Sequence, residues 1–168
     1  EGFILYRYNS IQQNDGNFNE VKKWISSLRF EYKNPIKSRF INFGYSYNWS
    51  ENNLIYNYSY NADGSTVLEA LNLKNHQKTH SVNAKISQYF SKIKTTFNLA
   101  GGYNFRTYDQ LLNDDLIEIH NTILTSNFDA SFRLLSWMTF EYKYGLTNYK
   151  NKFSKESESR SITNQIHQ

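Results

Sequence analysis

The sequence contains no cysteine, a single proline, only seven glycines and no long hydrophobic run. Without cysteine, a disulfide scaffold, a thiolate metal site and a cysteine nucleophile are all excluded. A transmembrane helix needs about 18 or more consecutive apolar residues, and no such stretch is present. A membrane-spanning β-strand needs only about 9–11 residues, so these absences leave membrane proteins built from strands open.

Aromatic residues are abundant although the chain is hydrophilic on average. Tyrosine and phenylalanine supply 14 and 12 of the 168 residues, aromatics reach 17%, and the mean hydropathy is -0.73. A soluble globule with so many rings normally also contains much leucine and valine, and this chain does not. In a β-barrel only alternate residues of each strand meet lipid while the others meet water, which reconciles the two properties.

The segment 39–50, RFINFGYSYNWS, shows the underlying pattern most clearly. Its odd positions after Arg39 are apolar or aromatic, from Ile41 to Trp49, and its even positions are mostly Asn, Ser and Gly. Alternation with a period of two predicts a strand with one apolar and one polar face. An apolar face tipped with aromatic rings, opposite an uncharged polar face, is typical of strands in membrane-spanning β-barrels.

The same alternation recurs along the chain and predicts about ten strands. The segment 66–73 is interpreted as a strand, although its residues also fit a helical turn. The strands are expected at 3–8, 24–33, 39–50, 54–61, 66–73, 82–90, 93–106, 121–133 and 138–146, with a last one beginning near 161. The polar loops are expected at 9–20, 75–79, 107–119 and 148–159, with a brief break at 51–53. The tight turns are expected at 34–37, 62–65, 91–92 and 134–136.

The connections alternate in length along the chain. Every second connection is a tight turn, whereas the long polar ones fall in the other set. Bacterial outer-membrane barrels have short periplasmic turns and long outer loops. We therefore predict an all-β fold, an antiparallel up-and-down transmembrane β-barrel, in which about ten strands belong to a larger barrel. Its aromatic girdles would comprise Trp24, Trp49, Tyr103 and Phe105 at the outer interface and Tyr32, Phe90 and Trp137 at the inner one.

The alternative fold is a soluble β-sandwich in which the rings fill the core, but a sandwich buries mainly Val, Ile and Leu. The chain opens at Glu1 in strand-like sequence without a signal peptide, and 161–168 reads as a strand just begun. We therefore expect residues 1–168 to be a partial barrel without a plug domain. An open arc leaves two unpaired edges, which cannot lie in lipid. Either further strands complete the barrel, or the ten strands close a smaller one.

Three segments between Ser81 and Tyr149 carry a family resemblance: SQYFSKIKTTFNLAGGYNF, DQLLNDDLIEI and LLSWMTFEYKY. Their Asn- and Ser-rich strands, short Ser-Lys turn and Gln-Leu-Leu-Asn loop resemble the barrel of TonB-dependent receptors. The resemblance is to the Bacteroidota type, which carries a carboxypeptidase-regulatory-like domain before its plug. It implies about 22 strands around a plug, a location in the cell outer membrane, and uptake of a nutrient ligand. The implied partners are outer-membrane lipid and, through other parts of such a receptor, the TonB complex and a surface lipoprotein.

Motifs for nucleophilic catalysis, zinc hydrolysis and phosphate binding are absent, so we expect no enzymatic activity and no cofactor. The metal-capable side chains that lie close in sequence are His120, Asp114, Asp115 and Glu118. Such a set could hold a divalent ion, but a solvated acidic loop tip is the favoured interpretation. The net charge of +4 is scattered along the chain, so nucleic-acid binding is not expected either.

The loop expected at 107–119 holds the candidate ligand contacts. Tyr108, Leu111 and Leu112 make it unusually apolar for an exposed loop, and they either contact a ligand or pack within the loop itself. Charged residues on the polar strand faces would project into the barrel lumen. They are Arg29, Glu31, Lys33, Lys85, Asp129, Arg133, Glu141 and Lys143.

Three functions are consistent with these features. The first is part of a TonB-dependent outer-membrane receptor that binds and admits a nutrient. The second is a barrel without transport function in a secretion or surface-assembly complex. The third is a soluble all-β binding module of a cell-surface protein.

Overall fold

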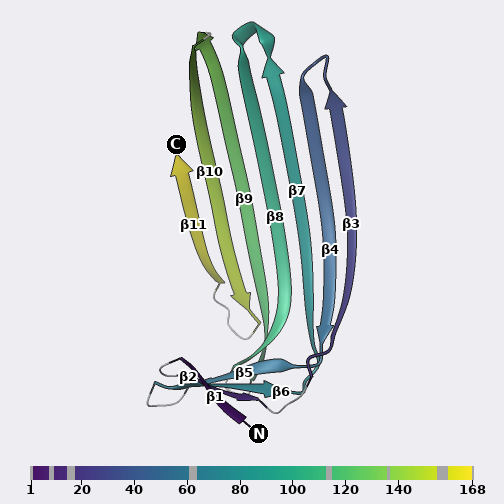
Figure 1. Ribbon diagram of the computed structural model, residues 1–168, viewed down its shortest axis with the longest axis vertical. Helices are drawn as coiled ribbons and strands as arrows, with labels where there is room; N and C mark the ends of the chain where they lie inside the picture. Colours follow the sequence, from purple (N-terminus) through teal and green to yellow (C-terminus); the bar gives the residue numbers. More distant parts are fainter. Residues whose placement is uncertain are drawn as a thin grey trace.

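Long antiparallel strands form the curved sheet that dominates the computed structural model of the protein (Figure 1). The structure describes residues 2–7, 10–14, 18–60, 64–112, 115–135, 137–154 and 159–167. The strands are β1 (Gly2–Arg7), β2 (Ser10–Asn14), β3 (Val21–Asn34), β4 (Arg39–Asn52), β5 (Ile55–Tyr60), β6 (Thr66–Leu71), β7 (Asn75–Phe90), β8 (Thr95–Leu112), β9 (Asp115–Leu135), β10 (Met138–Phe153) and β11 (Ser159–His167). A single 3-10 turn in the described residues, η1 (Ser91–Ile93), links β7 to β8. No helix in this part of the chain is long and apolar enough to cross a membrane.

Seven strands make up a continuous antiparallel ladder in the order β3-β4-β7-β8-β9-β10-β11. Its register is regular, and β8 pairs with β9 from Thr95↔Phe132 to Leu112↔Asp115. The predicted all-β class and antiparallel sheet are confirmed. Within the described residues no pairing joins β3 to β11, so the sheet is open and the strands do not close a small barrel.

The other four strands form an arm at one end of the ladder (Figure 1). Within this arm β5 pairs with β6 and β1 with β2, both antiparallel, and β6 pairs in parallel with β2. A short parallel pairing, Asn57↔Leu111 and Tyr58↔Leu112, attaches the arm to the end of β8. Because β4 pairs directly with β7, residues 53–74 are an insertion into the β4–β7 hairpin. The predicted up-and-down order through every strand is therefore wrong, since alternation identifies the faces of a strand but not its neighbours.

Several strands extend into segments that were predicted as loops. The expected loop at 107–119 consists of the end of β8 and the start of β9, and β7 already begins at Asn75. β10 continues to Phe153, and β2 occupies part of the expected loop at 9–20. The segments by which these strands exceed their predicted length are mostly polar. Their backbone N–H and C=O groups still pair with the neighbouring strand, although apolar and polar residues no longer alternate there. The predicted strand at 66–73 is confirmed as β6.

The register gives the ladder two faces of opposite character. One face, the aromatic face, carries the apolar residue of each alternation on neighbouring strands. It includes Trp24, Leu28, Phe30, Tyr32, Ile41, Phe43, Tyr45, Tyr47, Trp49, Val82, Ile86, Phe90, Phe97, Leu99, Tyr103, Phe105, Leu124, Phe128, Phe132, Phe140, Tyr142, Tyr144 and Leu146. The other face, the polar face, carries mainly Asn, Ser, Thr, Gly and charged residues.

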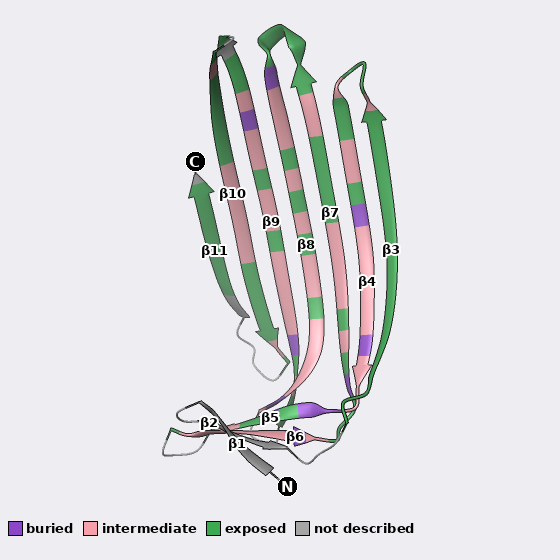
Figure 2. Ribbon diagram, viewed as in Figure 1, coloured by how far each residue is buried: buried purple, intermediate pink, exposed green. Residues whose placement is uncertain are grey.

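Buried residues are few in the described part of the ladder (Figure 2). Most of the buried hydrophobic side chains gather where the arm meets the ladder. They are Leu54, Ile55, Ala70, Leu111 and Ile119, and Ala130 is buried within the ladder itself. The described residues therefore form a small core at the arm and none beneath the long sheet.

Candidate functional site

The aromatic face of the ladder is uncovered by any second layer of the described chain. The extensive contacts between elements are those between hydrogen-bonded neighbours, and the arm is joined to the ladder at the end of β8. Large side chains therefore remain open, with Leu28 63%, Leu99 51% and Phe140 53% exposed. In a soluble domain the apolar face of a sheet packs against another layer. A large exposed apolar face marks a site of contact with a partner or a membrane.

Each of five neighbouring strands carries a stretch of nine residues whose aromatic-face positions are mostly apolar, with Ser26, Gln88 and Ser126 as the polar exceptions. It spans 24–32 on β3, 41–49 on β4, 82–90 on β7, 97–105 on β8 and 124–132 on β9. Together with the shorter stretch 140–146 on β10, these residues form what we name the apolar band. A tilted strand crosses a bilayer with about 9–11 residues. The band is therefore as long as a membrane crossing requires.

The apolar band is displaced along the strands between β3–β4 and β7–β9. In one row of paired residues, Trp24 on β3 and Trp49 on β4 are aromatic, whereas the residues of the same row on β7–β10 are polar. Those polar positions are Lys78, Thr107, His120 and Lys152. At the other boundary the row begins with polar Asn34 and Arg39 and becomes apolar on β8–β10. Its later members are Gln88, Phe97, Ala130 and Tyr142.

This displacement lies at the step from β4 to β7. The stretch 41–49 of β4 projects through the pairing onto 78–86 of β7, whereas the apolar stretch of β7 is 82–90. The stretch 82–90 of β7 in turn projects onto 124–132 of β9 without displacement. The band is therefore shifted by four residues between β4 and β7 and shows no net shift from β7 to β9.

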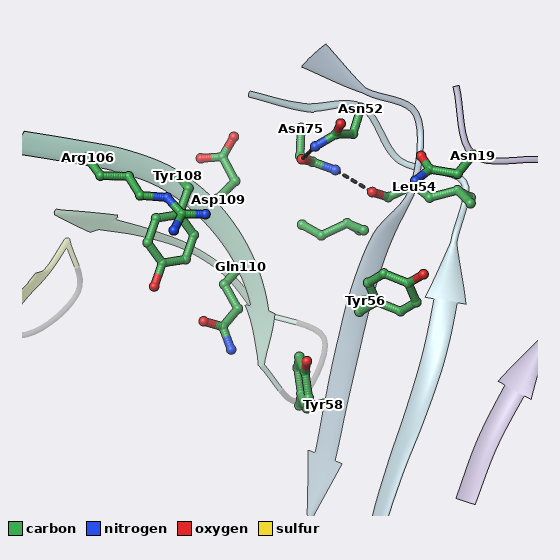
Figure 3. A pocket seen from close by; sticks show the side chains of 11 residues that line it. Asn19, Asn52, Leu54, Tyr56, Tyr58, Asn75, Arg106, Tyr108, Asp109 and Gln110 are labelled. Atoms are coloured by element: carbon green, nitrogen blue, oxygen red, sulfur yellow. Dashed lines mark hydrogen bonds between the residues drawn. The ribbon is translucent and has the colours of Figure 1, made fainter. Parts of the chain in front are cut away.

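A pocket of about 390 Å³ lies between the arm and the polar face (Figure 3). Asn75 is buried in its wall and donates from Nδ2 to the Leu54 carbonyl at 2.6 Å. Asn52 donates in turn to Asn75 Oδ1 at 3.2 Å, which ties the start of the arm to the ladder. The remaining lining residues are Asn19, Ile55, Tyr56, Tyr58, Arg106, Tyr108, Asp109 and Gln110.

Arg106 supplies the cationic group of this pocket. Its guanidinium carbon lies 4.8 Å from the centroid of the Tyr108 ring, and Nη2 donates to Gln77 Oε1 at 2.8 Å. It forms no ion pair with a carboxylate among the described residues. Asp109 also lines the pocket, but it alternates to the opposite face and its carboxylate accepts the His76 backbone N–H at 3.2 Å. The charged group of the lining that remains available to a ligand is therefore the Arg106 guanidinium, which is positive.

The three predicted ligand contacts lie in β8 and not in a loop. Tyr108 lines the pocket, Leu111 is only 5% exposed beneath the arm, and Leu112 pairs with Tyr58. The assignment to an exposed loop is wrong, because these residues are covered by an arm that comes from a distant segment. Arg106 was missed as a pocket residue for the same reason, since nothing in its local sequence indicates the arm.

The acidic cluster near His120 forms part of β9. His120 Nε2 lies 3.6 Å from a Glu118 carboxylate oxygen, and Asp114 lies outside the described residues. His76 and His80 both lie within β7, which occupies the loop expected at 75–79. Among the described residues no three histidine or acidic side chains come together as a metal site.

The charged residues predicted to share one side of the sheet do lie together on the polar face. Glu31 pairs with both Arg29 and Lys33, the latter at 3.1 Å, and Lys143 pairs with Glu141 at 3.5 Å. Each pair joins residues two apart on the same strand. Exposed pairs of this kind contribute little stability, so their main effect is to keep this face hydrated.

The structure thus defines an all-β protein with an open antiparallel sheet, an uncovered aromatic face and a pocket on its polar face. No protein-family model and no curated protein matches the chain. Inference about function therefore depends on the residues and their geometry.

Proposed function

We propose that this chain forms part of the wall of an outer-membrane β-barrel, with the aromatic face against lipid and the polar face toward an aqueous lumen. The observation that carries the proposal is the apolar band, which is nine residues long on five neighbouring strands and uncovered. The equal length of these stretches supports the same arrangement, because a bilayer sets one crossing length for every strand. A soluble sheet has no reason to give its apolar stretches the same length.

The ends of the ladder support one orientation of this wall. At one end the strands turn soon after the band, at residues 35–38 and 91–94. At the other end β8 continues from Phe105 to Leu112, and the arm is inserted there. Short turns face the periplasm in bacterial barrels, and longer connections face outward. The arm and its pocket therefore belong to the outer side.

The open edges also fit a wall that further strands complete. In a seven-stranded antiparallel ladder the two edge strands, β3 and β11, run in the same direction. Closing it as an antiparallel barrel takes an odd number of additional strands, which gives the even total usual in bacterial outer-membrane barrels. Unpaired backbone groups in lipid cost several kcal/mol each, so both edges must be paired in a membrane.

Among outer-membrane barrels, we place this chain with TonB-dependent receptors that take up a nutrient ligand. The resemblance of the segments between Ser81 and Tyr149 supports this, and so does a pocket at the outer end of the polar face. Uptake through such a receptor is driven from the inner membrane. Collapsing the proton gradient with an uncoupler should therefore stop ligand accumulation by cells that carry the complete receptor. Accumulation that persists would instead indicate a passive pore.

The membrane placement is tested by an arginine on each face of β8. Leu99→Arg introduces a charge into the apolar band, at a cost of about 2–4 kcal/mol near the bilayer midplane. Asn98→Arg introduces the same side chain one residue away on the polar face. We expect Leu99→Arg to lower the amount recovered in outer-membrane fractions, whereas Asn98→Arg should match the parent. Leu99 is 51% exposed, so a soluble sheet would tolerate both changes, and equal recovery would contradict the proposal.

A further inference from the structure

We propose that the pocket between the arm and the polar face binds a small organic acid, with Arg106 as the anchor of its carboxylate. The site is built from the arm and the end of β8, so this inference holds whether or not the aromatic face lies in lipid.

Arg106 is oriented for an anion that the described chain does not supply. A guanidinium has five N–H donors in a planar fork, and the hydrogen bond to Gln77 occupies part of it. The guanidinium lies over the Tyr108 ring, and this contact restrains the side chain and lowers the entropy lost when a ligand binds. A carboxylate matches this fork with two parallel hydrogen bonds, which gives the strongest and most specific pairing available to arginine.

The rest of the pocket fits the body of such an acid. Figure 3 shows the arm side chains Tyr56 and Tyr58 on one side of the space and the β8 side chains on the other. The two tyrosines are 42% and 36% exposed, so their rings remain available, and Leu54 is buried beside them. An aromatic or other apolar body can lie on these rings. The volume of about 390 Å³ is within the range of small-molecule sites.

The charge of the pocket argues against a cationic ligand. Asp109 is the acidic side chain of the lining, and its carboxylate is held by the His76 N–H on the opposite face. The amides of Asn52 and Gln110 are neutral and accept or donate hydrogen bonds without selecting charge. Arg106 therefore decides the sign of the ligand.

Benzoate and benzamide test this proposal, because they share a ring and differ in charge. Equilibrium dialysis of the full chain in neutral detergent micelles should show benzoate bound at least about tenfold more tightly than benzamide, the advantage expected of hydrogen bonds to a charged partner. Inorganic phosphate should compete weakly if the site selects a carboxylate on an apolar body. Phosphate that displaces benzoate fully at equal concentration, or equal binding of the two ring compounds, would overturn the assignment.

Matched variants distinguish binding in this pocket from a general effect of removing one positive charge. Arg106→Gln should remove the preference for benzoate, and Tyr108→Phe should keep it because the ring remains. Arg39→Gln is the control, since Arg39 also donates to a glutamine of β7, Gln88 at 2.7 Å, but on the aromatic face. Loss of the preference in Arg39→Gln as well would contradict the proposal.

If Arg106→Gln does not fold, a second variant provides an independent test. Arg106→Lys keeps the positive charge and loses the planar fork, so the benzoate preference should fall without disappearing. An unchanged preference in Arg106→Lys would show that bidentate pairing does not operate, and would overturn the role given to Arg106.

Discussion

Glycine on the polar face permits polar side chains of neighbouring strands to lie flat across the sheet. A Cβ built on Gly44 would lie 2.7 Å from Asn83 Oδ1, and one built on Gly102 would lie 2.7 Å from Thr125 Oγ1. Both separations are too short for a real side chain. Gly101 is different, because its Cβ would meet only the Thr125 carbonyl oxygen at an ordinary 3.7 Å. These two adjacent glycines therefore have different structural roles.

Alanine at these two positions should give opposite results. Gly102→Ala forces the stiff, β-branched Thr125 to move and is expected to lower the free energy of unfolding by about 1–3 kcal/mol. Gly101→Ala should be neutral, or stabilising by up to about 1 kcal/mol, because it restricts the unfolded chain. Urea unfolding of the folded chain in micelles measures both. Adding Thr125→Ala to Gly102→Ala should restore stability, and failure to do so would contradict the steric cause.

Single elements differ in how far their sequence predicts them. β4 is predicted almost to the residue, because Ile41 to Trp49 alternate strictly and a Pro-containing turn precedes them. The parts of β8 and β9 within 107–119 are missed, because the positions that continue the aromatic face there are mostly polar, as at Thr107, Asp109 and Glu118. A backbone ladder continues wherever a partner strand lies alongside, whatever the side chains are.

The arm shows what alternation cannot provide. β5 has the same alternating tyrosines as a ladder strand, so its sequence gives no sign that it pairs with the end of β8. Side-chain periodicity records which face is buried, whereas the neighbour of a strand depends on long-range pairing. Tyr108 was singled out for its apolar surroundings, but the pocket it lines exists only because the arm lies across β8. The candidate site was therefore predictable in part, and its shape was not.

At the scale of the whole molecule, the main feature is the apolar band. Five neighbouring strands carry stretches of the same length, nine residues, which is about what a strand needs to cross a bilayer. The edge strands β3 and β11 run the same way, so the sheet needs further strands to close. The side chains that give most proteins a core are instead spread over an open face. A bilayer would replace that core, which is the central claim of the proposed function.

The absence of cysteine makes this claim directly measurable, because each introduced cysteine is the only site for a spin label. We would label positions 97–105 of β8 one at a time in a reconstituted lipid bilayer. The accessibility of each label to oxygen, which concentrates in lipid, and to a water-soluble nickel complex would then be compared by electron paramagnetic resonance. The account predicts a period of two, with labels at the odd positions 97, 99, 101, 103 and 105 in lipid and labels at the even positions 98 to 104 in water. Labels that are accessible to the nickel complex on both faces would contradict it.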